Sequence, residues 1–181
     1  MPERHLPQVV DLHNDLLSEL IFERDRGRSG RFGSFWLPQL RAAGVTVQVL
    51  PVFTEDYFVG EGALRRCLLT IDLAGELASA YADDVVICLA AADLEAAAES
   101  GRIALILAFE GLEPVGADLG VLRTLHRLGV RVASLTWNRR TMLADGAGEE
   151  GTRAGLTGVG AAAIAEMARL GMVVDVSHLS E

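Results

Sequence analysis

A helix–glycine–strand pattern occurs three times in this sequence. Residues 41–45, 127–130 and 169–172 each close a helical stretch with a glycine and then open an aliphatic run. Glycine is favoured there because the residue after a helix often takes a left-handed backbone conformation that penalises a side chain. Helix, glycine stop and buried strand form the second half of a βαβ unit, so the sequence predicts an α/β fold with a parallel sheet.

The predicted strands are nearly continuous runs of Val, Ile and Leu rather than alternating patterns. Continuous apolarity is typical of strands that are covered on both faces, as in a parallel sheet lined by helices. The strands are expected at residues 9–12, 45–50, 103–109, 130–136 and 172–177, with 85–89 as a further candidate.

Helices are predicted between these strands. The longest covers residues 62–82, where apolar side chains recur every three or four positions. Three shorter helices each follow a residue whose side-chain oxygen can accept the free amides of a first turn. These are Asp93 before 94–100, Asp118 before 119–128, and Thr157 before 158–170.

A glycine-rich stretch at residues 138–156 shows no periodicity and is predicted to be a long loop. Long loops that follow the strands of a barrel usually serve the functional site. The alternative is a mobile surface excursion without a role.

Charge and hydropathy exclude several classes of protein. The 16 basic and 25 acidic residues leave a net charge of −9, which disfavours binding to a nucleic-acid backbone. No run approaches the roughly 18 uninterrupted apolar residues of a membrane-spanning helix, and the N-terminus lacks the apolar core of a signal peptide. We therefore expect a cytoplasmic protein that binds neither nucleic acid nor membrane. Cys67 and Cys88 lack a zinc-binding spacing and are predicted to be reduced, buried thiols.

Four side chains with metal-binding chemistry follow predicted strands. His13 and Asp15 come just after the first strand, and Glu110 and His178 follow two later ones. In a parallel-strand barrel, functional groups gather at the carboxyl ends of the strands, so these four can converge. Imidazole and carboxylate groups are ligands for zinc and similar cations. The set indicates a metallohydrolase.

Each of these residues also has a structural alternative. A His-x-Asp triplet is more often a helix-capping aspartate beside a surface histidine. A carboxylate after a deeply apolar strand needs a partner, so Glu110 could bridge two cations or form a salt bridge with an arginine. Asp175 could orient an imidazole or serve a purely structural role.

Five motifs, in order along the chain, resemble the renal (membrane) dipeptidase family. They are Val-Asp-Leu-His-Asn-Asp-Leu at 10–16, Phe-Glu-Gly at 109–111, Ser-Leu-Thr-Trp-Asn at 134–138, the stretch 155–172, and Val-Asp-Val-Ser-His at 174–178. The resemblance spans essentially the whole chain and matches about the N-terminal half of that family's barrel. It implies an eight-stranded βα barrel with two zinc ions that hydrolyses dipeptides and, in some members, other small amides.

The resemblance also implies roles for individual residues. His13 and Asp15 would hold one zinc ion, Glu110 would bridge the two, and His178 would hold the other, with a metal-bridging hydroxide attacking the peptide bond. The family's second histidine for the latter ion, its substrate-anchoring arginine and its catalytic aspartate lie in the later part of the barrel, so no catalytic residue is assigned here. Trp137 replaces a histidine that contacts the scissile carbonyl in mammalian-type members, and it is the candidate substrate-binding residue.

The length limits how much of a barrel this sequence can form. An eight-stranded barrel typically takes about 250 residues, whereas five or six strands are predicted in 181. We therefore expect residues 1–181 to be the N-terminal part of a single barrel domain that is weakly active or inactive in isolation. Another copy could cover the open sheet edges in a homo-oligomer. There are two alternatives to a dipeptidase. The protein could be a hydrolase of other amides or lactones with a binuclear metal site, or a non-catalytic remnant.

Overall fold

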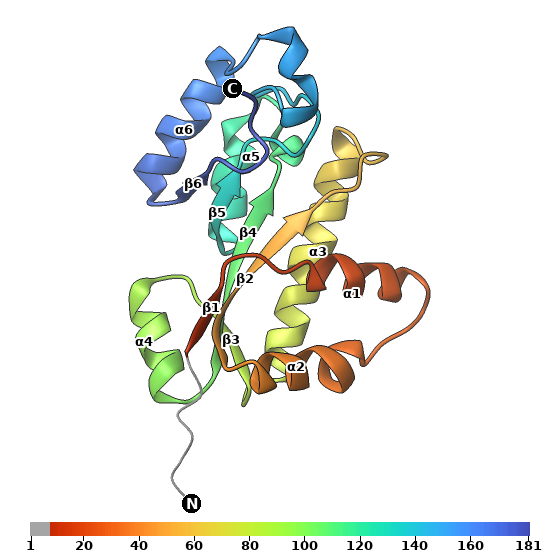
Figure 1. Cartoon of the computed structure of the whole chain (residues 1–181), viewed down its shortest axis with the longest axis vertical. Coiled ribbons are helices and arrows are strands. Elements are labelled where there is room, and N and C mark those ends of the chain that lie inside the picture. The colour runs from red at the N-terminus through yellow and green to blue at the C-terminus, as the bar shows by residue number, and fades with distance from the viewer. Residues whose placement is uncertain (1–7) are drawn as a thin grey trace, which may run out of the picture. The chain divides into compact units, whose positions relative to one another are not determined.

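The computed structural model describes residues 8–181, in which strands and helices alternate (Figure 1). The strands are β1 Val9–Asp11, β2 Val45–Phe53, β3 Val85–Ile87, β4 Ile103–Glu110, β5 Val130–Ser134 and β6 Val173–Asp175. The α-helices are α1 Leu16–Asp25, α2 Leu37–Ala42, α3 Glu61–Ala80, α4 Ala91–Glu99, α5 Leu119–Arg127 and α6 Gly158–Leu170. A π-helix covers Phe32–Trp36, and 3-10 helices cover Glu113–Val115 and Ala147–Thr152.

These strands form one sheet in the order β1-β2-β4-β5-β6, with β3 also paired to β4. The pairs β1–β2, β3–β4, β4–β5 and β5–β6 are parallel. Strand β3 pairs with the first half of β4, from Ile103 to Leu105, and β5 pairs with its second half, from Leu107 to Phe109. The parallel α/β sheet predicted from the continuous apolar runs is therefore confirmed.

All the predicted strands are present, but several end at different residues. Strand β2 continues three residues beyond its predicted end, to Phe53, and β4 includes Glu110 as its last residue. Strands β5 and β6 are shorter than predicted, because the chain leaves the sheet after Ser134 and after Asp175. A strand ends where its neighbour stops offering hydrogen bonds, and the hydropathy of one segment does not record this.

The described residues form two compact units, of which the first comprises residues 8–50 and Asp72–Ile106. Helix α1, which the sequence analysis does not predict, buries Leu16, Leu17, Leu20 and Ile21 in this unit. The π-helix brings Gly33 so close to Tyr81 that a Cβ would lie 2.3 Å from the phenolic oxygen. Glycine is therefore required for Tyr81 to pack edge-on against Phe32, with ring centroids 5.0 Å apart.

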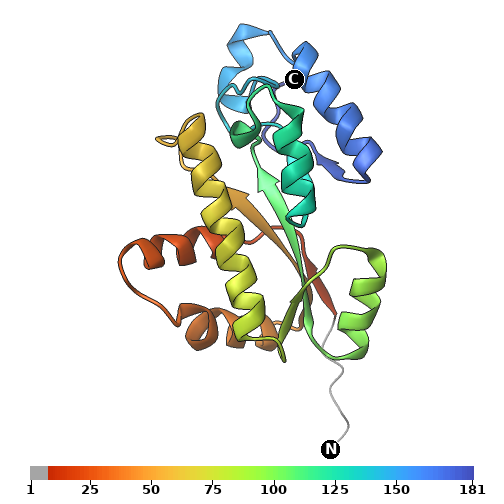
Figure 2. The same ribbon diagram turned by 180° about the vertical axis from the view of Figure 1, so that it is seen from behind.

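The second unit comprises Pro51–Ile71 and Leu107–Glu181. Helix α5 packs against β5 and α6, and α6 packs against β6, as the view from behind shows (Figure 2). Fully buried apolar side chains from strand, loop and helix fill its core, including Phe109, Leu122, Leu125 and Leu135. The carboxyl end of β4, which carries Glu110, is therefore supported by a closely packed apolar core.

The glycine stops and two of the three predicted helix caps are confirmed. Gly44, Gly129 and Gly171 have left-handed φ angles of 72°, 111° and 71°. Asp118 accepts a hydrogen bond from the Gly120 amide at 2.7 Å, and Thr157 accepts one from the Gly160 amide at 3.0 Å.

The prediction that Asp93 is the N-terminal cap of a helix is wrong. Helix α4 begins two residues earlier than Asp93, at Ala91, and Ala90 occupies the cap position. The Asp93 carboxylate instead reaches back from the first turn and accepts the amides of Leu89 and Ala90 at 2.7 and 2.8 Å. An alanine has no oxygen to offer the helix, so an acid within the first turn satisfies the neighbouring amides from the other side.

Both cysteines are buried free thiols, as predicted. Burial raises the pKa of the Cys67 thiol to about 12, so this side chain stays protonated and unreactive at neutral pH. Among residues 8–181, none of the helices combines the length and the apolar character that crossing a membrane requires.

Candidate metal centre

His13 and Asp15 lie directly after the end of β1. The His13 Nε2 atom is 3.6 Å from a carboxylate oxygen of Asp15. Asp15 occupies the cap position of α1, yet its side chain makes no capping hydrogen bond; the Asn14 side chain accepts the Leu16 amide instead, at 3.0 Å. The structural alternative for Asp15, a helix-capping carboxylate, is therefore not what the structure shows. A neighbouring asparagine performs the cap, and the aspartate faces the imidazole.

Glu110 is the last residue of β4, and its side chain is only 12% exposed. Its Oε1 atom is 2.9 Å from Nε2 of His178. A half-buried carboxylate needs compensating charge or hydrogen bonds, and the structure supplies an imidazole that is 68 positions further along the chain (178 − 110).

His178 is fixed by its surroundings through both its backbone and its ring. Its φ angle is +64°, which is uncommon for a residue with a side chain. Its carbonyl oxygen accepts hydrogen bonds from the Thr136 hydroxyl at 3.0 Å and from the Ala147 amide at 2.8 Å. The ring Nδ1 atom lies 3.2 Å from the side-chain oxygen of Asn138, so Nε2 is the nitrogen that faces Glu110.

Asp175 was predicted either to orient an imidazole or to have a structural role, and the hydrogen bonds that it makes are structural. Its carboxylate accepts hydrogen bonds from the amide and the hydroxyl of Ser177, at 2.9 and 2.7 Å. These bonds shape the turn that leads from β6 to His178. The side chain beside Nδ1 of the imidazole is that of Asn138, which the sequence analysis does not single out.

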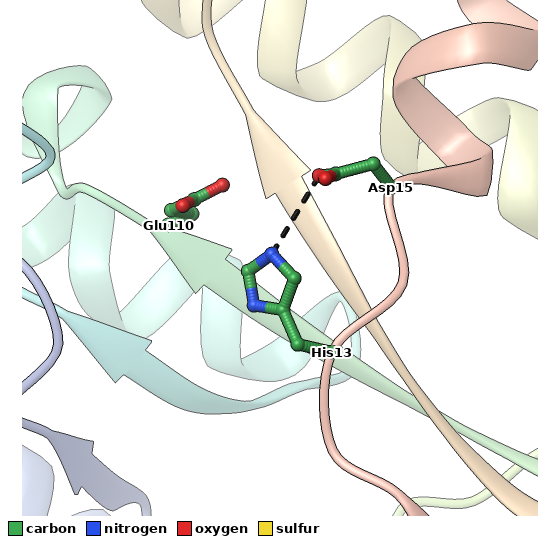
Figure 3. A group of neighbouring side chains, drawn as sticks. All are labelled: His13, Asp15 and Glu110. Atoms are coloured by element: carbon green, nitrogen blue, oxygen red, sulfur yellow. Dashed lines mark ion pairs between the residues drawn. The ribbon is translucent and has the colours of Figure 1, made fainter.

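His13 and Asp15 of the first unit, and Glu110 of the second, carry side chains that could each hold a cation. Figure 3 shows the three side chains, with the contact between the His13 imidazole and the Asp15 carboxylate dashed. One imidazole nitrogen and two carboxylate oxygens match the donor set of catalytic zinc sites, which use nitrogen and oxygen ligands and leave a position open. The donors present therefore fit a divalent metal ion.

Trp137 lies beside the Glu110–His178 pair. Its ring centroid is 6.1 Å from that of His178 and 5.1 Å from that of Phe53, with edge-on packing against the phenylalanine. Together with Glu110 and Arg139 it lines a small pocket at the end of β4. The substrate-binding role of Trp137 remains a prediction.

The loop predicted after β5 contains a 3-10 helix, Ala147–Thr152, and several of its residues donate hydrogen bonds to Asp145. This side chain is 2% exposed, and hydrogen bonds from Arg140 and Thr152 lower its pKa to about 2. Sequence reasoning did not single out Asp145. The available signal was an acid placed between an apolar pair, Leu143 and Ala144, and a glycine, where burial would require hydrogen-bond donors.

Comparison with known proteins identifies the family. The model of the membrane dipeptidase family, peptidase family M19, matches residues 4–181. The chain belongs to this family. Dipeptidase aclJ of Aspergillus oryzae is 35% identical over 158 residues, which cover 82% of this chain and 37% of that protein. Dipeptidase verJ of Clonostachys rogersoniana is 35% identical over 173 residues, covering 94% and 43%. The M19 chain thus spans less than half the length of these two relatives.

Solved structures of two metallopeptidases, the first of them an M19 family member, share the fold. The metallopeptidase dipeptidase AC superposes with a TM-score of 0.87 at 25% identity, covering 98% of this chain and 58% of that one. A metallopeptidase from Rhodobacter sphaeroides, liganded with a phosphinate mimic of the dipeptide L-Ala-D-Ala, gives 0.84 at 24% identity, covering 96% and 59%. The sheet corresponds to part of a TIM-type barrel, which confirms the predicted fold class.

Proposed function

We propose that the protein is a zinc-dependent dipeptidase that hydrolyses the peptide bond of dipeptides. The observation that carries this proposal is the contact between the Glu110 carboxylate at the end of β4 and the His178 imidazole in the turn after β6, whose facing atoms are 2.9 Å apart. Membership of a metallopeptidase family and the dipeptidase names of the relatives support it. So does the dipeptide mimic bound to a structurally similar protein.

Four residues of the chain would hold the two zinc ions. His13 and Asp15 would hold one, His178 the other, and Glu110, whose carboxylate has two oxygens, would bridge them. A pair of bound divalent cations supplies a nucleophile from water at neutral pH and stabilises the charge that develops on a carbonyl oxygen. Glu110 also offsets positive charge in a region where few waters reach its carboxylate, because its side chain is 12% exposed.

Trp137 would contribute to substrate binding from the side of His178. A tryptophan offers an apolar ring and a single N–H donor, with no nitrogen that titrates near neutral pH. It can therefore pack against a small side chain of the substrate or donate one hydrogen bond, whereas proton transfer must be performed by another group. This restricts Trp137 to binding and orientation.

The test combines metal binding with a substrate panel on the purified chain. We expect zinc to bind and to be removed by a chelator, and dipeptides such as L-Ala-D-Ala to be cleaved in preference to N-acyl amino acids and lactones. The 181-residue chain alone should cleave them weakly. Glu110→Gln should abolish both properties, while Glu99→Gln, at an exposed position near the end of α4, should change neither. Wild-type protein that binds no zinc, or that prefers lactones, would contradict the proposal.

A further inference from the structure

The Asp145 carboxylate ties together the two ends of the segment that follows β5. One oxygen accepts a hydrogen bond from the Arg140 guanidinium. The other accepts the Thr152 hydroxyl and the amides of Ala154 and Gly155, the latter two at 3.1 Å. Charge-assisted hydrogen bonds of this kind are stronger than neutral ones. The segment is thereby folded around a single buried acid.

The backbone next to Asp145 is hydrogen-bonded to the residues around His178. The Ala147 amide donates to the His178 carbonyl at 2.8 Å, and the Ser180 amide donates to the Asp145 carbonyl at 3.1 Å. Between these two bonds, Gly146 forms an antiparallel bridge with Leu179. A shift of the Asp145 backbone would therefore also shift the His178 backbone, because these hydrogen bonds join the two segments.

The same segment also holds the imidazole ring. The Asn138 side-chain oxygen lies 3.2 Å from Nδ1 of His178, and the Asn138 carbonyl accepts the Gly148 amide at 2.7 Å. With Nδ1 facing this oxygen, Nε2 is left 2.9 Å from Glu110. An orienting hydrogen bond to the other ring nitrogen is what a metal-binding histidine requires.

Two glycines show how closely this segment is packed. A Cβ added at Gly146 would lie 2.2 Å from the Trp137 carbonyl oxygen, and one added at Gly148 would lie 2.7 Å from the Asn138 carbonyl oxygen. Backbone oxygens cannot move aside as the end of a flexible side chain can. The segment thus has little freedom to shift without also moving the residues beside His178.

We propose that Asp145 is a positioning residue for the metal centre, which fixes the backbone and the ring of His178 by folding the segment between Asn138 and Gly155. This rests on the proposed function, because the role of His178 as a metal ligand is part of it. Asp145 does not contact Glu110 or an ion. It acts through the amides and carbonyls of its own segment.

The test compares two acids whose pKa values are lowered in the same way, the buried Asp145 and the partly buried Glu166. Glu166 also has a pKa lowered to about 2, by Arg169 and Arg123, but it joins the outer helices α5 and α6. Asp145→Asn keeps the shape of the side chain and removes its charge, and Glu166→Gln is the matched control. A general loss of stability would affect both variants, whereas a positioning role concerns Asp145 alone.

Two measurements separate this proposal from the proposed function. In metal-free protein, Asp145→Asn should speed hydrogen exchange at the Ala147 and Ser180 amides by about tenfold or more, because their segment opens locally. In calorimetric titration, it should weaken zinc binding by about 10- to 100-fold. Glu166→Gln should do neither. If Asp145→Asn fails to fold, Thr152→Val, which removes one donor, should shift both quantities in the same direction by less.

The outcomes are distinguishable. Unchanged exchange at Ala147 and Ser180 in Asp145→Asn would overturn the proposal, as would faster exchange with wild-type zinc affinity. An equal loss of zinc affinity in Glu166→Gln would overturn it too. If wild-type protein bound no zinc, the proposed function would fail and the positioning proposal with it, even where the exchange result showed that Asp145 folds the segment.

Discussion

The two pairs of candidate ligands in this M19 chain are brought together in different ways. His13 and Asp15 are two positions apart after β1, and their side chains are 46% and 67% exposed. Glu110 and His178 come from the ends of different strands, and their side chains are 12% and 32% exposed. The first pair depends on a short stretch of local backbone. The second pair depends on the sheet, on the apolar core beneath it and on the segment that follows β5.

This difference shows where each pair is vulnerable. A change in the local turn disturbs the first pair and leaves the rest of the protein folded. A change in the core or in the segment around Asp145 reaches the second pair through backbone hydrogen bonds, even from residues that touch neither ligand. The predictions below test this contrast, beginning with the largest expected effect.

Truncating the apolar residue that precedes each ligand pair should change the stability of the protein by very different amounts. Phe109 precedes Glu110 and is fully buried, whereas Leu12 precedes His13 and is 72% exposed. Phe109→Ala should lower the free energy of unfolding by about 3–5 kcal/mol, because it leaves a cavity in the core. Leu12→Ala should change it by less than about 0.5 kcal/mol. Urea denaturation measures both, and similar values would remove the contrast.

The two asparagines of the chain should affect different properties. Asn138→Leu removes the acceptor beside His178 and should weaken zinc binding by about 10- to 100-fold. Asn14→Leu removes the acceptor of the Leu16 amide and should instead cost about 1 kcal/mol of stability. Zinc titration and urea denaturation of both variants give the comparison. Equal effects on zinc affinity would show that the local pair is as dependent on its neighbours as the distant one.

Lowering the pH should reduce the stability that Asp145 gives to its segment and the stability that Glu166 gives to the α5–α6 contact over the same pH range. The pKa of Asp145 is lowered from 3.8 to about 2, and that of Glu166 from 4.5 to about 2. Each carboxylate is ionised in the folded state at pH values where the unfolded chain is already protonated. Their contribution to stability is thus complete above about pH 4.5 and is lost as the pH falls toward 2.

Urea midpoints measured between pH 2 and pH 6 test this. Asp145→Asn and Glu166→Gln should each flatten the decline at low pH. A decline that is unchanged in both variants would show that other carboxylates cause it.

Much of the architecture could be predicted because its signals are local. Gly44, Gly129 and Gly171 mark helix ends, since the left-handed conformation they adopt is a property of one residue. Asp118 and Thr157 cap the helices that they precede. Asp93 was assigned wrongly because the same carboxylate can satisfy amides from the cap position or from inside the first turn, and only the helix start decides between them.

The candidate site could be predicted in part for the same reason. The positions of His13, Asp15, Glu110 and His178 after strands are visible in the sequence, and the motifs around them match one family. The supporting residues were missed. No local sequence pattern indicates that Asn138 contacts His178, or which residues, 140, 152, 154 and 155, donate hydrogen bonds to Asp145.

The sequence by itself determined the α/β pattern, the helix stops and the candidate ligand residues, because hydropathy, glycine conformation and side-chain chemistry are properties of short segments. Only the tertiary structure decided that Asp15 faces an imidazole rather than its own helix, and that Glu110 is paired with a histidine 68 positions away. It also decided that a loop folds around one buried acid. These outcomes depend on which groups lie next to each carboxylate in the folded chain, and the sequence of one short segment does not determine that.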